Sequence, residues 1–395
     1  MQQMSIKSVF LLQAIFVMLL PGSSCYAKGN EKAYPEMKSL FQNELQKQHV
    51  YSAFFAVYSP SHSIDWKFVG GEFQNGQAVS ADNPFYAASI GKTFTATAIA
   101  LLTEQGKLHF DDRIDRYLPD SIINNLHVLE GQDHSSNLTI AQLLQHTSGL
   151  PDYFEGKTHD GSPNMMELIF ADPSKRWEPI SLIRFSKEKM QPLFAPGTSY
   201  NYTDTEYVLL GLVIEQTSGL PLPEFFRKHF FEPLEMNHTS MYLRSQPLAP
   251  TSKMAEFYVG DFDASQMTSL TADWAGGGLV STAADLIKFQ SALFSGEIVS
   301  AATLKTMQRW TPETKGMDYG FGLRKIAFDQ LSPGMPHLEI IGHSGSTGSF
   351  MFYCPQLDAY LAGTLNQVEE AKNSIVFLMK ILLQLEKEMA VCREK

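Results

Sequence analysis

The stretch from Phe85 to Leu102, FYAASIGKTFTATAIALL, constrains this chain more than any other. It predicts a long apolar helix, and near its start Ser89 and Lys92 stand three residues apart. Positions i and i+3 of a helix share a face, so a hydroxyl and an ammonium would point into one pocket. A helix N-terminus also favours nearby negative charge, which suits a nucleophilic serine. Taken alone, the spacing occurs often by chance and is more typical of a surface serine beside a snorkelling lysine.

Length and charge limit the class of protein. A chain of 395 residues can bury a large core and suits one large or two medium domains. Hydrophobic residues make up 44% of it and charged residues 18%, as in ordered globular proteins. The net charge of -11 argues against general nucleic-acid binding, because that binding depends on basic patches. No nucleic-acid partner is therefore expected.

The first 27 residues have the order of a secretory signal peptide. Lys7 precedes an apolar run from Val9 to Leu20, and a turn and small residues then lead to Ala27. We expect cleavage after Ala27 and a periplasmic or secreted location. A membrane anchor and a lipid on Cys25 are the alternatives, but the run is short for a bilayer and residues 22–24 fit a lipidation motif poorly. No later stretch is expected to span a membrane.

The two ends of the chain predict the same kind of structure. A helical pattern over residues 31–48 precedes two β-branched and aromatic stretches that indicate a strand hairpin, residues 50–58 and 64–69. Near the C-terminus, closely connected strand patterns indicate an antiparallel meander, and an amphipathic helix follows. These ranges are 319–326, 338–342, 348–353 and 359–365 for the strands and 372–392 for the helix. The two ends are expected to share one antiparallel sheet covered by helices.

The middle of the chain has a different character. From Leu108 to about Asp285, strand patterns are rare, and short helical patterns alternate with loops rich in proline and glycine. We expect an α+β fold in which a mostly helical domain, residues 108–285, is inserted into an α/β sheet domain made of residues 28–107 and 286–395.

Two further stretches carry side chains suited to acyl transfer. In APGTSYNYTDTEYVLLG, Tyr202 and Asp204 lie on a turn-rich loop before a helix. A tyrosine near a lysine can shuttle protons, because the ammonium lowers the cost of forming phenolate. In IGHSGSTGSF, small residues flank His343 on an expected strand, which suits the close approach of a substrate to the strand edge. Alone, Tyr202 also fits a packing aromatic, and His343 a structural histidine.

Other stretches favour structural roles. In AGGGLVSTAAD, residues 275–285, the glycines indicate a tight backbone, and Ser281 or Thr282 could cap the next helix. Cys354 and Cys392 have no His or Cys neighbour at metal-ligand spacing. We expect two inert thiols, and a disulfide between them is the alternative that the sequence leaves open. Neither a metal nor another cofactor is expected.

Together and in this order, the motifs resemble the signature of the penicillin-recognising serine hydrolases, the group of class C β-lactamases, D-Ala-D-Ala carboxypeptidases and related esterases. That signature is S-x-x-K, then Y-x-N, then K-T-G or H-x-G. Here it corresponds to Ser89–Lys92, Tyr202–Asp204 and His343–Gly345. Connecting phrases such as LLQHTSGLPDY are also similar, and the likeness runs from about Tyr51 to Asn366. The resemblance implies a β-lactamase/transpeptidase-like fold with its site between the sheet domain and the helical domain.

The resemblance also implies catalytic roles. Ser89 would be the acylated nucleophile, and Lys92 and Tyr202 would share its activation and the delivery of a proton to the leaving group. The backbone N–H groups of Ser89 and Ser346 would form the oxyanion hole. His146, within HTSGL, is expected to be a structural loop residue rather than a catalytic base.

A second set of residues would bind the substrate. The strand at His343, Ser344 and Gly345 would line it, and Ser344 would hydrogen-bond its carboxylate or amide. Asp204 and Tyr153 complete this set.

Two departures from the family pattern bear on the substrate. His343 stands where class C β-lactamases have lysine, and the loss of a fixed positive charge weakens the case for an efficient β-lactamase. Asp204 stands where asparagine is usual. An amide can donate to a substrate carbonyl, whereas a carboxylate only accepts. Asp204 could hold Lys92 in its charged form or favour a substrate with a cationic group.

The leading hypothesis is an exported serine hydrolase that acts through an acyl-enzyme on an amide or ester. A D-Ala-D-Ala-type peptide is the first substrate guess, because export would place the chain beside peptidoglycan. β-Lactamase and carboxylesterase are alternatives within the same family, so the expected partners are a small peptide, a β-lactam or an ester. A non-catalytic binding or scaffold protein on the same fold is the alternative from another class.

Overall fold

The computed structural model describes residues 22–250 and 252–393. The predicted signal peptide covers residues 1–27, and residues 1–21 of it lie outside the described residues. Its cleavage stays a prediction. Among the described residues, the helices are too short or too polar to cross a lipid bilayer.

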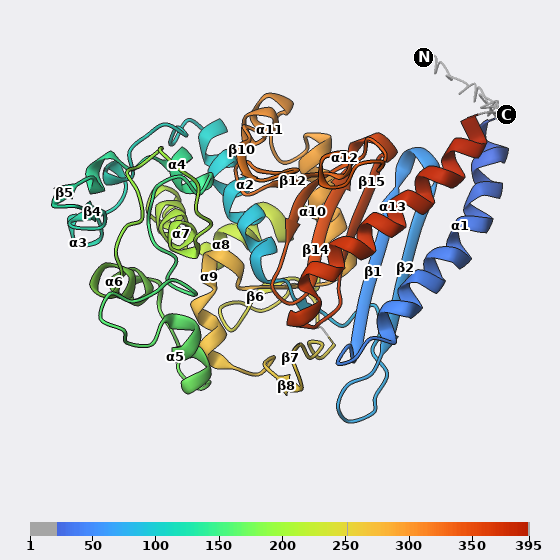
Figure 1. Ribbon diagram of the computed structural model, residues 1–395, viewed down its shortest axis with the longest axis horizontal. Coiled ribbons are helices and arrows are strands. Elements are labelled where there is room, and N and C mark those ends of the chain that lie inside the picture. The colour runs from blue at the N-terminus through green and yellow to red at the C-terminus, as the bar shows by residue number, and fades with distance from the viewer. Residues whose placement is uncertain (1–21, 251, 394–395) are drawn as a thin grey trace, which may run out of the picture.

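One antiparallel sheet joins the two ends of the chain (Figure 1). Its strands run in the order β10 (Thr311–Thr314), β11 (Met317–Tyr319), β12 (Arg324–Ala327), β13 (Glu339–Ser344), β14 (Ser349–Cys354), β15 (Ala359–Thr364), β1 (Ser52–Ser59) and β2 (Ile64–Gly71). The N-terminal hairpin is attached through β1 to β15, with Ala56 opposite Ala362. This pairing confirms the expected antiparallel sheet.

The two faces of the sheet are covered by different helices. On one face, α1 (Gly22–Leu45) and α13 (Ala371–Arg393) lie side by side (Figure 1), and on the other α10 (Ala283–Ser295) packs against β1, β14 and β15. Successive side chains of a strand point to opposite faces of the sheet, so neighbouring residues contribute to different cores. In β15, Leu361 belongs to the core under α1 and α13, whereas Ala362 belongs to the core shared with the inserted helices.

Phe377 of α13 anchors the outer layer to the sheet. Its side chain is buried, and its ring lies edge-on to Phe55 of β1, with 5.1 Å between ring centroids. Changing Phe377 to alanine should lower the free energy of unfolding by about 3–5 kcal/mol through the cavity it leaves. Its neighbour Val376, which is 46% exposed, is the matched control, and Val376→Ala should change stability by less than about 0.5 kcal/mol. Urea unfolding measures both, and equal losses would contradict this packing.

Helices make up most of the regular structure in the region from 108 to 285, and long irregular loops connect them. Its helices are α3 (Asp120–Ile123), α4 (Ile140–Leu144), α5 (Met165–Ala171), α6 (Pro179–Lys189), α7 (Asp204–Ser218), α8 (Leu222–Phe226) and α9 (Trp274–Gly277). Its strands are short, namely β4 (Val128–Leu129), β5 (Gln132–Asp133), β6 (Ser240–Met241), β7 (Tyr258–Val259), β8 (Phe262–Asp263) and β9 (Leu279–Ser281). We propose that this region is the inserted domain, with the bounds that the sequence predicts.

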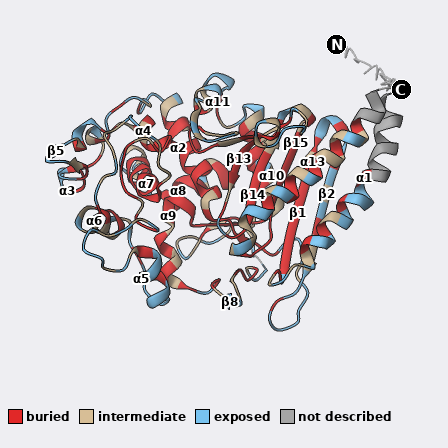
Figure 2. Cartoon of the chain, viewed as in Figure 1, coloured by how far each residue is buried: buried red, intermediate tan, exposed pale blue. Residues whose placement is uncertain are grey.

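The helix α2 (Gly91–Glu104) lies at the centre of the molecule. It packs against α7 and α9 of the inserted region, and most of its residues are buried (Figure 2). Alongside its apolar side chains it buries Lys92 and three threonines, Thr93, Thr95 and Thr97, whose hydroxyls donate to backbone carbonyls. β3 (Phe85–Tyr86), just before it, pairs with β9, and so ties its start to the end of the insertion.

Several predicted boundaries differ from the structure. Ser89 was expected inside the helix, but it lies in a 3-10 turn, Ala88–Ile90, and the helix begins at Gly91. The strand expected over 319–326 is two strands, β11 and β12, because the chain turns at Gly322 with φ +64°. A side chain at Gly322 would collide with Ala96 of α2. Thr282 does cap α10, through its side chain and the N–H of Asp285. Two further helices, α11 (Ala301–Met307) and α12 (Phe328–Leu331), complete the described fold.

Candidate active site

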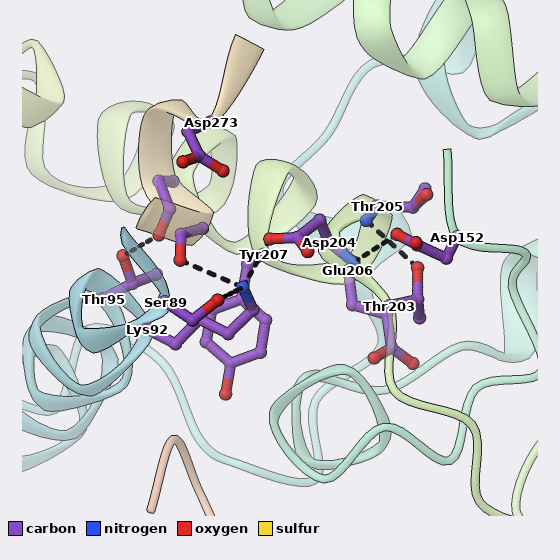
Figure 3. A network of polar contacts seen from close by, with 12 residues as sticks. Ser89, Lys92, Thr95, Asp152, Thr203, Asp204, Thr205, Glu206, Tyr207 and Asp273 are labelled. Atoms are coloured by element: carbon purple, nitrogen blue, oxygen red, sulfur yellow. Dashed lines mark hydrogen bonds and ion pairs between the residues drawn. The ribbon is translucent and has the colours of Figure 1, made fainter. Parts of the chain in front are cut away.

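Ser89 and Lys92 lie together where the turn passes into α2. Ala88, with φ +48°, is held in the left-handed region just before the serine. The Nζ atom of Lys92 is 3.3 Å from Ser89 Oγ (Figure 3). Ser89 is half-buried and lines a cavity, whereas Lys92 is fully buried. The predicted pairing of hydroxyl and ammonium is therefore present.

Asp204 holds the ammonium of Lys92 in place. It is the first residue of α7, and its Oδ1 forms an ion pair with Lys92 Nζ. The carbonyl of Gly276 accepts a second hydrogen bond from Nζ at 3.0 Å. Burial is the largest single effect and lowers the pKa of Lys92, but the charges and hydrogen bonds of Asp204 and Tyr202 together raise it by more, so the net shift is upward. Lys92 is thus held as an ammonium at neutral pH.

Tyr202 lies on the loop before α7, with its ring near two cations. Lys92 Nζ is 4.9 Å and the guanidinium of Arg324 is 5.6 Å from the ring centroid. Burial raises the pKa of Tyr202, while Lys92 and Arg324 act in the opposite direction, as does a hydrogen bond with Ser89. Tyr202 is therefore a neutral phenol in contact with the serine, in a field that lowers the cost of forming phenolate.

His146 and Glu206 form a buried pair that packs against the ring of Tyr202. His146 Nδ1 is 2.5 Å from Glu206 Oε2, and neither side chain is exposed. The imidazole ring lies 4.4 Å from the ring of Tyr202. Burial lowers the pKa of His146 well below its ordinary value. The placement agrees with the structural role expected for His146.

The side chain of His343 is buried beside Tyr202, with 6.2 Å between ring centroids, and is not part of the lining of the cavity, whereas its strand is expected to line the substrate. It is fully buried, and its Nε2 lies 2.9 Å from the hydroxyl of Tyr319 while its Nδ1 lies 2.7 Å from the carbonyl of Ser344. Burial, followed by Arg324, lowers its pKa well below the ordinary value. The histidine is neutral, and strand alternation explains its direction, since Ile341 two residues earlier belongs to the inner core.

Gly345 and Ser346 lie against the nucleophile turn. A side chain on Gly345 would come within 2.5 Å of the carbonyl oxygen of Ala87, so only glycine allows the strand this close. Ser346 is exposed and lines the cavity. Ser344 is half-buried, with its Oγ 3.4 Å from Arg324. The strand end therefore closes one side of the space next to Ser89.

A cavity of about 560 Å³ opens beside Ser89. Carboxylates line part of it, namely Asp152, Glu155, Asp204 and Asp273. Apolar side chains line much of the rest, among them Phe154, Met166, Ile169, Phe170 and Phe257. In the part of the chain whose side chains are described, no group of three or more His, Cys, Asp or Glu is arranged to hold a metal ion.

Tyr153 lies behind the cavity rather than in its wall. Its side chain is fully buried and its hydroxyl donates to the carbonyl of Ala272 at 2.7 Å. Its two neighbours, Asp152 and Phe154, line the cavity instead. Side chains of an irregular loop follow no regular spacing. The sequence therefore does not show that Asp152 and Phe154, and not Tyr153, face the cavity.

The sequence patterns do not point to three carboxylates of the site, Asp152, Glu155 and Asp273, or to one glycine. Asp152 lies inside LLQHTSGLPDY, a stretch used only for its likeness to the family, and Asp273 lies two residues before AGGGLVSTAAD. Gly276 was assigned to a tight backbone only. In the structure its carbonyl binds Lys92, and a side chain there would collide with Asp204. The run of glycines at residues 276–278 was the signal that could have pointed to it.

Comparisons with known proteins fit this geometry. The family described as Beta-lactamase matches residues 37–384. Penicillin-binding protein 4* of Bacillus subtilis (strain 168) is 26% identical over 307 residues, which are 72% of this chain and 62% of that protein. Penicillin-binding protein 4 of Amycolatopsis lactamdurans is 26% identical over 299 residues, 70% of each chain. The chain thus spans less than two thirds of the length of the Bacillus protein.

A solved structure shows the same fold. D-amino acid amidase from Ochrobactrum anthropi SV3, complexed with L-phenylalanine amide, has a TM-score of 0.76 and 23% identity, and the match covers 91% of this chain and 99% of that one. This likeness confirms the predicted α+β, β-lactamase/transpeptidase-like architecture. Since the family match extends over most of its length, the chain belongs to the Beta-lactamase family of serine hydrolases.

Proposed function

We propose that the chain is an exported hydrolase that forms an acyl-enzyme at Ser89 with an amide or ester. The observation that carries the proposal is Ser89 Oγ in the wall of a cavity, 3.3 Å from the buried ammonium of Lys92. Burying an ammonium is costly, and a binding or scaffold protein has no need of one beside a serine hydroxyl. Export is supported by the pattern of residues 1–27.

The geometry supports different roles for Lys92 and Tyr202. Because Asp204 keeps Lys92 charged, the lysine acts through its positive field. In that field Tyr202 first gives up its own proton to solvent, and the resulting phenolate takes the proton of Ser89. Ser89 Oγ then bonds to the carbonyl carbon, the bond to the leaving nitrogen or oxygen breaks, and Tyr202 returns the proton to the leaving group. Water later cleaves the acyl-enzyme and restores Ser89.

The developing oxyanion would be bound by the backbone N–H groups of Ser89 and Ser346. Gly345 supports this assignment, because it lets the strand end lie directly against the turn that carries Ser89. Removing one such donor typically costs about 10²–10³ in rate.

Two substrates are candidates for this site. A D-Ala-D-Ala-type peptide follows from the family resemblance and from export. Its terminal carboxylate would need a cation. Lys92 is paired with Asp204, and Arg324, beside Ser344, is held by Glu313 through contacts of 2.6 and 2.7 Å. An amide without that carboxylate is the second candidate, and it is favoured by the acidic cavity lining.

A substrate panel tests the proposal. D-Ala-D-Ala peptide, nitrocefin, a D-amino acid amide and a short-chain ester would be offered to the purified chain, and the turnover of each would be measured. We expect turnover of the amide or the ester, and little of nitrocefin because Lys is replaced by His343. Failure to turn over any of the four, with no acyl-enzyme detectable by mass spectrometry, would refute the proposed function.

A further inference from the structure

The charges facing the candidate substrate cavity are unbalanced. Asp152, Glu155, Asp204 and Asp273 line it, whereas its lining includes no Lys, Arg or His. Lys92, behind the wall, already pairs with Asp204. A cavity that holds the nucleophile and a surplus of carboxylates favours a substrate that carries a positive charge.

Asp273 is a carboxylate of the cavity lining that lies close to the nucleophile turn. It occupies the N-cap position of α9, yet its side chain makes no capping hydrogen bond, and the hydroxyl of Tyr86 donates to its Oδ2 at 2.9 Å. A Cβ on Gly277 would lie 2.9 Å both from Asp273 Oδ2 and from the carbonyl carbon of Ala88. The carboxylate of Asp273 therefore lies beside the backbone that carries the nucleophile.

Asp152 adds to the negative potential from another side. Its Oδ1 accepts from the backbone N–H of Asp204 at 3.0 Å, and in the view of Figure 3 Asp204 lies between it and Asp273. Burial and then the charge of Asp204 raise the pKa of Asp152 to about 6 and that of Asp273 to about 7. Such shifts are expected where several carboxylates lack enough cations, and a bound cation would relieve them.

The rest of the cavity wall is apolar and reaches the surface. Phe154 and Ile169 are buried in it, while Met166 and Phe170 of α5 are 36% and 40% exposed at its edge. Large exposed apolar side chains beside a cavity suit an apolar group on the ligand. The site thus offers one anionic contact next to Ser89 and a broad apolar surface.

We propose that Asp273, aided by the negative potential of Asp152, binds a protonated amino group of the substrate next to the attacked carbonyl. The substrate class is then an amide or ester of an amino acid with a free amino group and a large apolar side chain. In such a molecule one carbon separates the amino nitrogen from the carbonyl, so an anion beside the nucleophile turn can pair with it. The inference rests on the proposed function, because that function places the attacked carbonyl at Ser89.

Binding can be measured without catalysis. In the Ser89→Ala variant, isothermal titration would compare 2-phenylethylamine with 3-phenylpropionate, which differ mainly in charge. We expect the amine to bind at least about tenfold more tightly. Asp273→Asn in the same background should remove that preference, and Asp82→Asn, at an exposed position outside the cavity lining, should keep it. Equal or tighter binding of the carboxylate would overturn the inference.

Turnover gives the second arm. The D and L forms of phenylalanine amide would be compared with their N-acetyl derivatives, which lack the charge. For the better enantiomer, kcat/KM should be about tenfold or more above that of the N-acetyl form, and Asp273→Asn should lower only the former, by about 10- to 100-fold. Equal loss for both forms would overturn the inference in favour of a structural role for Asp273.

The two proposals fail in different ways. Acylation of Ser89 without any preference for the amine, in both tests, would reject the ammonium contact and leave the serine hydrolase standing. Preferential amine binding to Ser89→Ala, with no acylation of the wild-type chain by any substrate, would support the contact and reject the hydrolase.

Discussion

Replacing Ser89 by alanine is expected to lower turnover of every substrate that the chain accepts by about 10⁴-fold or more. The reason is that Ser89 Oγ is the atom that would bond to the substrate carbonyl, 3.3 Å from Lys92 Nζ in the cavity wall. The fold should be unaffected, because the half-buried hydroxyl faces a cavity. Turnover is followed with the best substrate of the panel, and stability by thermal melting.

Ser61→Ala serves as the control for this change. Ser61 is exposed on the loop between β1 and β2 and lies outside the cavity lining. Its replacement should leave turnover within about twofold of wild type. Retention of more than a tenth of the activity in Ser89→Ala would mean that another group carries the reaction.

Replacing Lys92 by methionine is expected to damage both activity and stability. Turnover should fall by about 10³-fold or more, because the positive field at Ser89 and Tyr202 is lost. Stability should fall by about 3–5 kcal/mol, because Asp204, 8% exposed, is left without its cation. Urea unfolding and steady-state kinetics measure the two effects.

The double variant Lys92→Met, Asp204→Asn separates the two effects. An asparagine carries no charge, so most of the lost stability should return. Activity should not return, because the ammonium is still missing. Recovery of activity in the double variant would show that Lys92 acts only by neutralising Asp204.

Strong periodic patterns predicted the frame of the fold well. The hairpin β1–β2, the helix α13 and the meander β13–β15 have alternating or helical spacing, and each lies within a few residues of its expected place. The α2 helix was recognisable by its long run of apolar and threonine side chains with few charges. The short helix α5 and the strand β10 were missed, since a few residues give too little pattern to decide.

Orientation within the candidate site was harder to predict. The order of motifs brought Ser89, Lys92 and Tyr202 together, and the structure has them in contact. It could not place Tyr153, because loop residues have no period. For His343 the strand pattern was informative. Side chains two residues apart on a strand point to the same face, so His343 should face the inner core as Ile341 does.

The structure shows what Asp204 does in place of the usual asparagine. The sequence left two options, a charged Lys92 or a cationic substrate. The ion pair with Lys92 answers the first. Asp152 and Asp273, which have no place in the motif set, supply the negative charge that would favour the second. Such a cluster forms from three distant stretches of chain, so only the fold reveals it.

The central claim is that Ser89 is acylated. Its most direct test is intact-mass spectrometry of the chain after incubation with a fluorophosphonate or a penicillin in excess, followed by peptide mapping. We expect a single adduct on the peptide that contains Ser89 and none on Ser89→Ala. An unmodified mass with both probes, or an adduct that persists in Ser89→Ala, would contradict the account.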